Sequence, residues 1–269
     1  MLTIPSVLEA RAIEELRREE LEEARAIQSV MLPAGMLRAG QATVMHEFQP
    51  VDTVGGDFLD YFQLPGSSVG FYVGDVSGKG LPAAMYAALA VGILRGIHKT
   101  GQSPGKVLSV LNQRLTSRGG LRRHAAILYG LFDPESSEMT LASAGMPGPL
   151  HFLATGCRVI ELSGIPQGLF PGSEYEAVSF TLQPGDSIVC CSDGITEAQN
   201  ARYEDFGIER LIEICNEGNL LPPAELLARI FILRPQLHRG HSPARRHGRR
   251  HLPTATLPVA TAQPAALFN

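Results

Sequence analysis

The sequence has few cysteines, no long apolar run and no acidic residues near its end. Four of the 269 residues are cysteines, and they show no metal-ligand spacing: Cys157, Cys190, Cys191 and Cys215. Cys190 and Cys191 lie in an apolar, strand-like run, so we interpret them as buried thiols, and we expect no disulfides. No run of about eighteen apolar residues is present, which argues against a membrane span. No basic, apolar leader opens the chain, so we expect a cytoplasmic protein.

Charge is distributed unevenly along the chain. All 27 acidic residues lie at or before Glu225, whereas seven arginines follow it. The chain up to residue 228 therefore has 16 basic and 27 acidic residues, a net charge of about −11. The histidines and arginines of the tail follow no helical or strand pattern. We therefore expect neither a nucleic-acid site nor a metal site there.

The first helix is expected over residues 8–31. Ile13, Leu16, Ala24, Ile27 and Met31 recur at three- and four-residue steps among Glu and Arg. This pattern fits either a helix docked on the domain or a dimerising, signal-transmitting coiled coil. Pro33 follows and ends the helix.

Strands and turns dominate the rest of the chain. Strands are predicted at residues 42–48, 58–64, 69–73, 125–132, 139–143, 150–153, 158–162, 175–182 and 187–191. Helices are predicted at residues 81–98, 104–116, 207–217 and 222–233. Strands grouped on either side of a helical pair favour an α+β sandwich over alternating βαβ units.

Three aspartates stand at predicted strand ends beside glycines. Asp57 follows two glycines in DTVGGDFLDYF, Asp75 ends a strand in FYVGDVSGKG, and Asp193 does so in IVCCSDGITEA. The Asp75 loop is no nucleotide-binding P-loop, because Val73 and Gly80 stand where that motif requires glycine and a hydroxyl. A single aspartate there could be a cap or turn residue. Three together favour Mg²⁺ or Mn²⁺ over zinc.

The order of several motifs is more specific than any one of them. VDTVGGDFLDYF, VGDVSGKGLPAAM, LYGLFDPESSEMTLASAGMPGPL, PQGLF and LQPGDSIVCCSDGITEAQNARYEDFGIERL follow one another, after the helical segment ARAIQSVMLP. In that order they resemble the SpoIIE/RsbU-like branch of the metal-dependent (type 2C-like, PPM) protein serine/threonine phosphatases. The resemblance covers residues 22–233.

This resemblance implies a four-layer α-β-β-α sandwich of two antiparallel sheets with two Mn²⁺ or Mg²⁺ ions at one edge. Asp75 and the Val76 carbonyl would bind metal, and Asp57 and Asp193 would each serve one ion. Close approach of the loops would depend on glycines: Gly55, Gly56, Gly74, Gly78 and Gly194. The ions would activate a water for hydrolysis of a phosphate ester, so no protein nucleophile is needed.

The resemblance also implies a substrate class and a set of domain boundaries. The substrate would be phosphoserine or phosphothreonine on a STAS-type anti-sigma-factor antagonist, in bacterial signalling or stress response. We expect a linker helix at residues 1–31 that could form a homodimer, a phosphatase domain at residues 32–233, and a disordered or frameshifted tail at residues 234–269.

Two residues of the family pattern differ here. Met146 stands in SAGMPGP where the family has histidine, and a thioether cannot make the hydrogen bonds of an imidazole. The family's last strand carries Asp-Asp, whose carboxylate completes the metal site, but no Asp or Glu follows Glu225. Loss of a ligand would lower metal affinity. The alternative function is therefore a weak or inactive regulatory domain that binds partner proteins.

The tail sequence suggests an origin for the second difference. Residues 236–248, QLHRGHSPARRHG, can be encoded so that a one-base shift of the reading frame yields His-Asp-Asp-Met at the expected place. The codons GCA CGA CGA CAT for residues 244–247 have this property. We hypothesise that the chain is out of frame after about Ile232.

Overall fold

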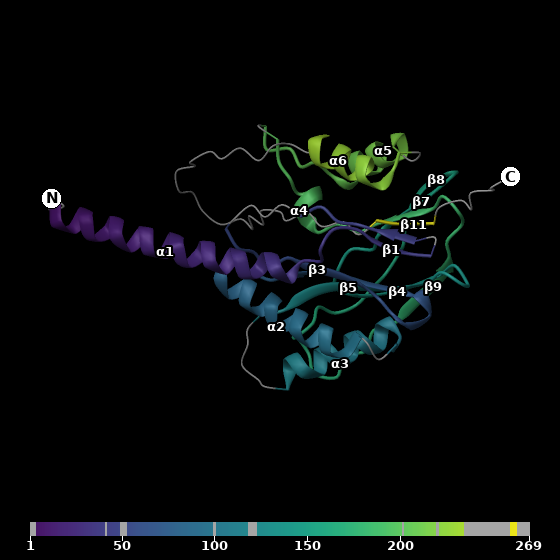
Figure 1. Ribbon diagram of the computed structural model, residues 1–269, viewed down its shortest axis with the longest axis horizontal. Coiled ribbons are helices and arrows are strands. Elements are labelled where there is room, and N and C mark those ends of the chain that lie inside the picture. Colours follow the sequence, from purple (N-terminus) through teal and green to yellow (C-terminus); the bar gives the residue numbers. More distant parts are fainter. Residues whose placement is uncertain are drawn as a thin grey trace.

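The computed structural model describes residues 4–40, 42–48, 53–98, 101–117, 123–200, 202–218, 221–233 and 259–262. The strands form two antiparallel sheets that pack against each other, and helices cover both outer faces (Figure 1). The predicted α-β-β-α sandwich, preceded by an N-terminal helix, is therefore confirmed.

The first sheet contains the strands closest to the candidate site. In the described residues it has five strands, in the order β3-β4-β5-β6-β9. Their bounds are β3 Phe58–Gln63, β4 Val69–Val76, β5 Ala125–Asp133, β6 Glu138–Ala144 and β9 Ala177–Thr181. β3 and β4 are nearly continuous apolar runs because both of their faces are covered, one by helices and one by the second sheet.

The second sheet includes a strand from the tail. Its order in the described residues is β1-β2-β11-β10-β7-β8. The bounds are β1 Leu37–Ala39, β2 Ala42–Val44, β11 Val259–Ala262, β10 Ser187–Val189, β7 Leu150–Leu153 and β8 Gly156–Val159. β11 pairs with both β10 and β2.

The expectation of a tail without regular structure is therefore wrong for residues 259–262. Their sequence, VATA, has two β-branched residues and no charge, so it suits a central strand. It also has no carboxylate that could bind a metal. The predicted frameshift and disorder over the rest of residues 234–269 lie outside the described residues.

Helices cover the sandwich on both sides. α2 (Leu81–Ile97) and α3 (Pro104–Thr116) lie on the first sheet, and α5 (Ile208–Glu217) and α6 (Pro223–Leu233) lie on the second (Figure 1). The short helix α4 (Asp193–Thr196) follows β10, and one 3-10 turn, Pro65–Ser67, connects β3 to β4. Three apolar clusters correspond to these layers: helices on the first sheet, sheet on sheet, and helices on the second sheet.

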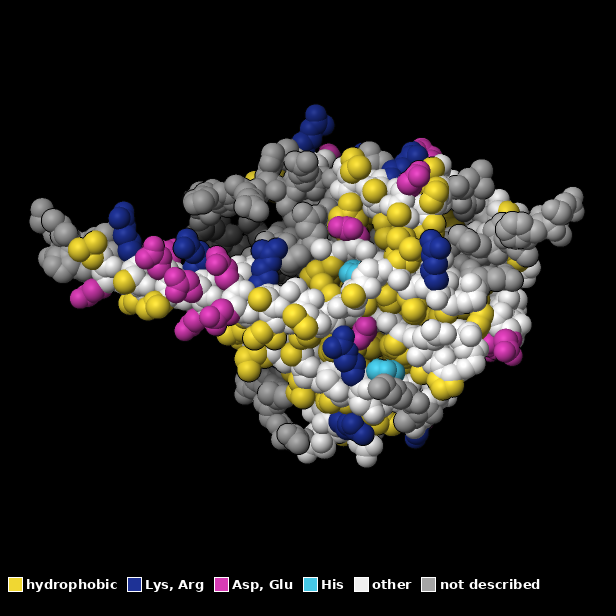
Figure 2. All heavy atoms as spheres, in the orientation of Figure 1, with side chains coloured by type: hydrophobic (Ala, Val, Ile, Leu, Met, Phe, Trp, Pro, Cys, Tyr) yellow, Lys and Arg dark blue, Asp and Glu magenta, His cyan; other side chains and the backbone are white. Residues whose placement is uncertain are grey.

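The N-terminal helix α1 (Ile4–Met31) projects from the sandwich over its first half (Figure 1). Three of the predicted stripe residues, Ile13, Leu16 and Ile27, are more than 60% exposed. Figure 2 shows acidic and basic side chains along this projecting half, with apolar side chains between them. These three stripe residues are therefore not docked on the domain, whereas Met31 at the end of the stripe packs against the apolar cluster of α2, α3 and the first sheet. In the part of the chain that the structure describes, no helix combines the length and hydropathy needed to cross a membrane.

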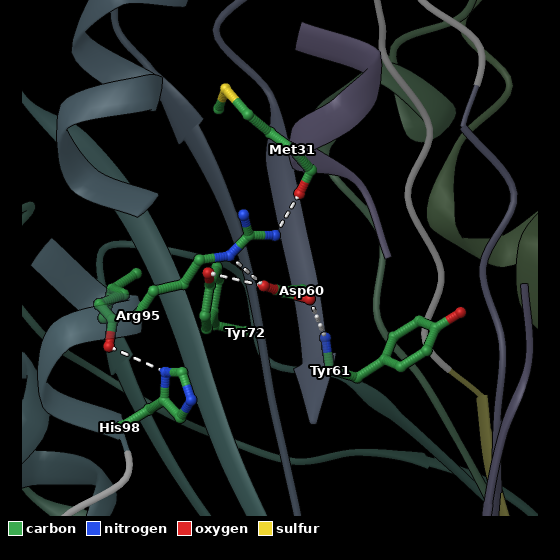
Figure 3. Close-up of polar contacts among 7 residues, drawn as sticks. Met31, Asp60, Tyr61, Tyr72, Arg95 and His98 are labelled. Atoms are coloured by element: carbon green, nitrogen blue, oxygen red, sulfur yellow. Dashed lines mark hydrogen bonds and ion pairs between the residues drawn. The ribbon is translucent and has the colours of Figure 1, made fainter. Parts of the chain in front are cut away.

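The end of α1 is attached to the first sheet through an arginine of α2. Arg95 donates to the Met31 carbonyl through Nη2 and to Asp60 of β3 through Nε, both at 2.7 Å (Figure 3). Asp60 also accepts from the Tyr61 amide at 3.0 Å and from the Tyr72 hydroxyl at 3.4 Å. Burial, and then the charge of Asp60, raise the pKa of Tyr72 far above its usual range, so this hydroxyl remains a donor.

Candidate metal centre

Asp57 and Asp75 lie at neighbouring strand ends of the first sheet. Phe58 of β3 pairs with Gly74 of β4 in antiparallel register. Asp57 immediately precedes Phe58 and Asp75 immediately follows Gly74, so the two aspartates lie next to each other at the same end of β3 and β4. Asp57 is 7% exposed and Asp75 is half-buried. This placement brings together two of the three carboxylates singled out from the sequence.

Gly56 brings the loop before β3 into contact with the end of β4. A Cβ at this position would lie 2.7 Å from the Val76 carbonyl oxygen and 3.2 Å from a carboxylate oxygen of Asp75. Only glycine allows the backbone to come so close. The oxygens expected to bind metal from β4 therefore face the backbone beside Asp57.

Gln28 of α1 holds this same loop through its side-chain amide. Its Nε2 donates to the Gly55 carbonyl at 2.8 Å and, more weakly, to the Asp57 carbonyl at 3.5 Å. Its Oε1 accepts from the Gly55 amide at 3.1 Å. Gln28 is 6% exposed although it lies on a largely exposed helix. Residue-by-residue reasoning missed it because a glutamine on a polar helix gives no signal of what it faces.

Asp193 begins α4 at the end of β10, in the second sheet. Its carbonyl accepts from the Glu197 amide at 2.7 Å, and its side chain is half-buried. In the described ranges, no group of three His, Cys, Asp or Glu side chains is arranged to hold a metal ion. The structure thus pairs Asp57 with Asp75 but does not bring Asp193 into a three-residue cluster with them. Its role as a ligand stays a prediction.

The remaining glycines of the predicted set have different local roles. Gly74 leaves room for the Phe58 ring, because a Cβ would lie 2.3 Å from a ring carbon. Gly78 has a φ of +97°, which favours glycine. Gly55 binds Gln28 through its backbone, and Gly194 is buried within α4. Gly74 is therefore needed for packing within the sheet.

The loop between β4 and α2 is attached to the residues that precede β5. The Ser77 amide donates to the His124 carbonyl at 2.8 Å, and the Ser77 hydroxyl accepts from the His124 amide at 3.1 Å. Arg123 donates through Nη1 to the Ser77 carbonyl at 2.6 Å. The Ser77 hydroxyl and backbone thus both join this loop to the start of β5. Arg123 was not found from the sequence, in which it belongs to an unpatterned basic stretch.

Met146 has a packing role in the turn where the family has histidine. It is 5% exposed and belongs to the apolar cluster between the two sheets. The Ser143 hydroxyl closes the turn by donating to the Met146 carbonyl at 2.7 Å and accepting from its amide at 3.0 Å. The backbone of this turn is therefore held without an imidazole.

The thiols beside Asp193 are not reactive groups. All four cysteines are free. Burial, and then the charge of Asp193, raise the pKa of Cys191 to about 12. Burial also raises the pKa of Cys190 well above its usual range. Both remain protonated at neutral pH, as expected of buried structural thiols.

The donors at this edge suit a hard divalent cation. They are the carboxylates of Asp57 and Asp75 and the backbone carbonyl of Val76, which are oxygen ligands of the kind that Mg²⁺ and Mn²⁺ prefer. The absence of a Cβ at Gly56 keeps the carbonyl and the Asp75 carboxylate accessible from the loop. The residues therefore fit the metal expected from the sequence.

A family model matches this chain, and so do several relatives, IcfG and RsbU among them. The model described as Stage II sporulation protein E (SpoIIE) matches residues 65–243, well over half of the chain. Protein IcfG of Synechocystis is 27% identical over 226 residues, which cover 74% of this chain and 36% of IcfG. Phosphoserine phosphatase RsbU of Bacillus subtilis is 25% identical over 207 residues, 76% of this chain and 62% of RsbU. The chain thus spans between 36% and 62% of the length of these relatives.

Solved structures share the fold. The SiaA-PP2C domain of Pseudomonas aeruginosa superposes with a TM-score of 0.77 at 19% identity, over 94% of this chain and 99% of that domain. RsbX in complex with magnesium superposes with a TM-score of 0.59 at 13% identity, over 81% of this chain and 93% of RsbX. At these identities, the likeness concerns the fold alone.

Proposed function

The chain belongs to the SpoIIE/RsbU-like branch of the PPM protein phosphatases, and on this basis we propose that it hydrolyses phosphoserine or phosphothreonine on a partner protein. The observation that carries the proposal is the edge formed by Asp57, Gly56, Asp75 and Val76. The oxygen donors of Asp57, Asp75 and Val76 come from two adjacent strand ends. Gly56 has no Cβ, so the loop backbone can lie close to the Asp75 and Val76 oxygens. Magnesium is present in the related RsbX structure.

In the proposed reaction a water oxygen attacks phosphorus, the bond from phosphorus to the seryl or threonyl oxygen breaks, and the released alkoxide takes up a proton. Two Mn²⁺ or Mg²⁺ ions held by Asp57, Asp75, Val76 and Asp193 would lower the pKa of water and offset charge on the phosphoryl oxygens. The chain's own contribution is to fix these donors. Gln28 holds the Asp57 loop, and the β3–β4 ladder sets the Asp57–Asp75 register.

We propose a phosphorylated STAS-type anti-sigma-factor antagonist, or a similar phosphoprotein, as the substrate. Support comes from RsbU, a phosphoserine phosphatase by name, and from a solved structure that combines RsbU and RsbW domains. We propose that the exposed apolar stripe of α1, with Ile13, Leu16 and Ile27, forms a homodimer. Signalling would take place in the cytoplasm.

The test is hydrolysis of a phosphoserine peptide and of p-nitrophenyl phosphate with Mn²⁺ or Mg²⁺. We expect metal-dependent release of phosphate that Asp75→Asn abolishes, because the amide cannot supply an anionic ligand. Asp133→Asn, a solvent-accessible aspartate at the end of β5, is the matched control and should keep activity. Peptide binding without turnover in the unmodified chain would instead support the alternative of a regulatory domain.

A further inference from the structure

Arg123 stands beside the candidate metal centre at the same edge of the first sheet. Val76 of β4 pairs with Ala125 of β5, and Arg123 is two residues before Ala125. Its guanidinium donates to the carbonyl of Ser77, the residue after Val76, at 2.6 Å. The side chain therefore extends along the loop that follows Asp75.

The guanidinium lies against the backbone of Gly78. A Cβ at Gly78 would be 2.3 Å from Nη1 of Arg123 and 3.7 Å from Nη2. A side chain at position 78 would therefore displace the Arg123 guanidinium, and glycine leaves room for it. Arg123 is half-buried, so it remains accessible from solvent.

Most of the hydrogen-bonding capacity of Arg123 is unused within the described residues. An arginine has five N–H donors, and the bond to Ser77 accounts for one of them. The ion pairs of the described part of the chain involve Arg18, Arg95, His151 and Arg229, and none involves Arg123. A positive group with available donors therefore lies along the loop that directly follows Asp75 and Val76.

The charge of the domain explains why such a group matters. The chain up to residue 228 has a net charge of about −11, which repels a phosphate dianion. A planar guanidinium binds phosphate oxygens through two parallel hydrogen bonds. We propose that Arg123 binds the phosphoryl group of the substrate at the metal edge and so selects phosphate monoesters. This inference rests on the proposed phosphatase function.

Arg123 has an alternative, purely structural role, in which it only holds the Ser77 loop in place through its hydrogen bond. The two roles differ in what is lost on substitution. A purely structural arginine affects the position of Asp75 and Val76 and therefore metal affinity, whereas a phosphate ligand affects anion affinity at unchanged metal affinity. Binding of Mg²⁺ and binding of orthophosphate are thus measured separately by calorimetry on the whole chain.

The variants are Arg123→Met, Arg123→Lys and, as a matched control, Arg38→Met on the exposed part of β1. With Mg²⁺ present, we expect Arg123→Met to weaken orthophosphate binding about 10- to 100-fold, as for loss of charged hydrogen bonds. Arg123→Lys should weaken orthophosphate binding less, because lysine keeps the positive charge but lacks the paired N–H donors of the guanidinium. Arg38→Met should have no effect, and Mg²⁺ affinity should be nearly unchanged in all three.

Equal orthophosphate affinity in Arg123→Met and the unmodified chain would overturn the inference, as would weakened Mg²⁺ binding that accounts for the whole loss. Absence of orthophosphate binding to the unmodified chain would overturn it as well. Arg123-dependent binding in a chain without turnover would refute the proposed function and leave the phosphate site standing. Circular dichroism establishes whether each variant is folded. If Arg123→Met is unfolded, the comparison uses Arg123→Lys instead.

Discussion

At the scale of single residues, Gly56 controls how close two oxygen donors come to the Asp57 loop. Any side chain there would meet the Val76 carbonyl at 2.7 Å and the Asp75 carboxylate at 3.2 Å. A methyl group cannot be accommodated without moving one of them. We expect Gly56→Ala to lower Mn²⁺ affinity about tenfold or more, in line with the effect of losing support around metal ligands. Calorimetric titration with Mn²⁺ measures this directly.

The control for that substitution is Gly92→Ala. Gly92 lies in α2, and a Cβ at this position would have no neighbouring atom within 4 Å among the described residues. Alanine there should leave Mn²⁺ affinity unchanged and stabilise the helix by up to about 1 kcal/mol. Unchanged Mn²⁺ affinity in Gly56→Ala would show that the loop can shift away and that the contact is unimportant.

A second residue-scale feature is a buried polar chain in the second sheet. His151 Nε2 donates to Asp186 at 2.9 Å, and Arg158 donates to His151 Nδ1 at 3.2 Å through Nε. The Gln183 amide also donates to Asp186, at 3.0 Å. Both His151 and Asp186 are almost fully buried. Asp186 therefore satisfies the buried His151 donor and, in addition, the backbone amide of the exposed Gln183.

Removing this carboxylate should be costly. We expect Asp186→Ala to lower the free energy of unfolding by about 1–3 kcal/mol, because it leaves the buried His151 donor unsatisfied. Urea denaturation measures the change, with Glu135→Ala, at an exposed position in the turn after β5, as a control for loss of negative charge. A change of less than about 1 kcal/mol would mean that water replaces the carboxylate.

At the scale of elements, α1 is joined to the sandwich at its last turn. Gln28 binds the loop that carries Asp57, and the Met31 carbonyl accepts from Arg95, which also binds Asp60 of β3 (Figure 3). Asp57 and Asp60 belong to the same short segment of chain. The end of α1 therefore touches the segment that supplies one expected metal ligand.

Loss of the Gln28 side chain tests this attachment. We expect Gln28→Ala to weaken Mn²⁺ binding about tenfold, because Gly55 loses both of its bonds to the helix. Arg25→Ala, exposed on the previous turn of α1, should have no such effect. Equal Mn²⁺ affinity in the two variants would mean that the β3–β4 ladder alone positions Asp57.

At the scale of the whole molecule, the tail contributes the strand β11 to the second sheet but has no acidic side chain. β11 lies between β2 and β10, so it joins two parts of the second sheet that would otherwise each have an open edge. Yet no Asp or Glu follows Glu225, so this tail supplies no carboxylate to the metal edge.

Replacing the tail tests both the missing ligand and the frameshift hypothesis. We expect a chain whose residues after Ile232 are translated from the alternative frame of its coding DNA to bind Mn²⁺ about 10- to 100-fold more tightly, since it regains an anionic ligand. Hydrolysis of p-nitrophenyl phosphate should rise with it. Equal activity in both chains, still abolished by Asp75→Asn, would mean that three carboxylates suffice.

Much of the fold was predictable because it depends on local patterns. Apolar alternation and turn residues located β3 to β10, with boundaries that differ by a few residues, and helical periodicity located α2, α3, α5 and α6. β1 was missed because three residues around a Gly40 turn carry too little pattern. β11 was missed because its strand character comes from pairing with β2 and β10, which are far from it in sequence.

The sequence by itself determined the α+β sandwich class, the motif order and the three candidate carboxylates, since residue type, spacing and turn chemistry are local properties; the layer order followed from the resemblance that the motif order carries. Only the tertiary structure decided that Gly56 contacts Asp75 and Val76, that Gln28 holds Gly55, and that Arg123 lies over Gly78. The physical reason is that each of these contacts joins segments brought together by strand register and helix docking. Such contacts depend on where side chains point in the folded sandwich, which residue type alone does not specify.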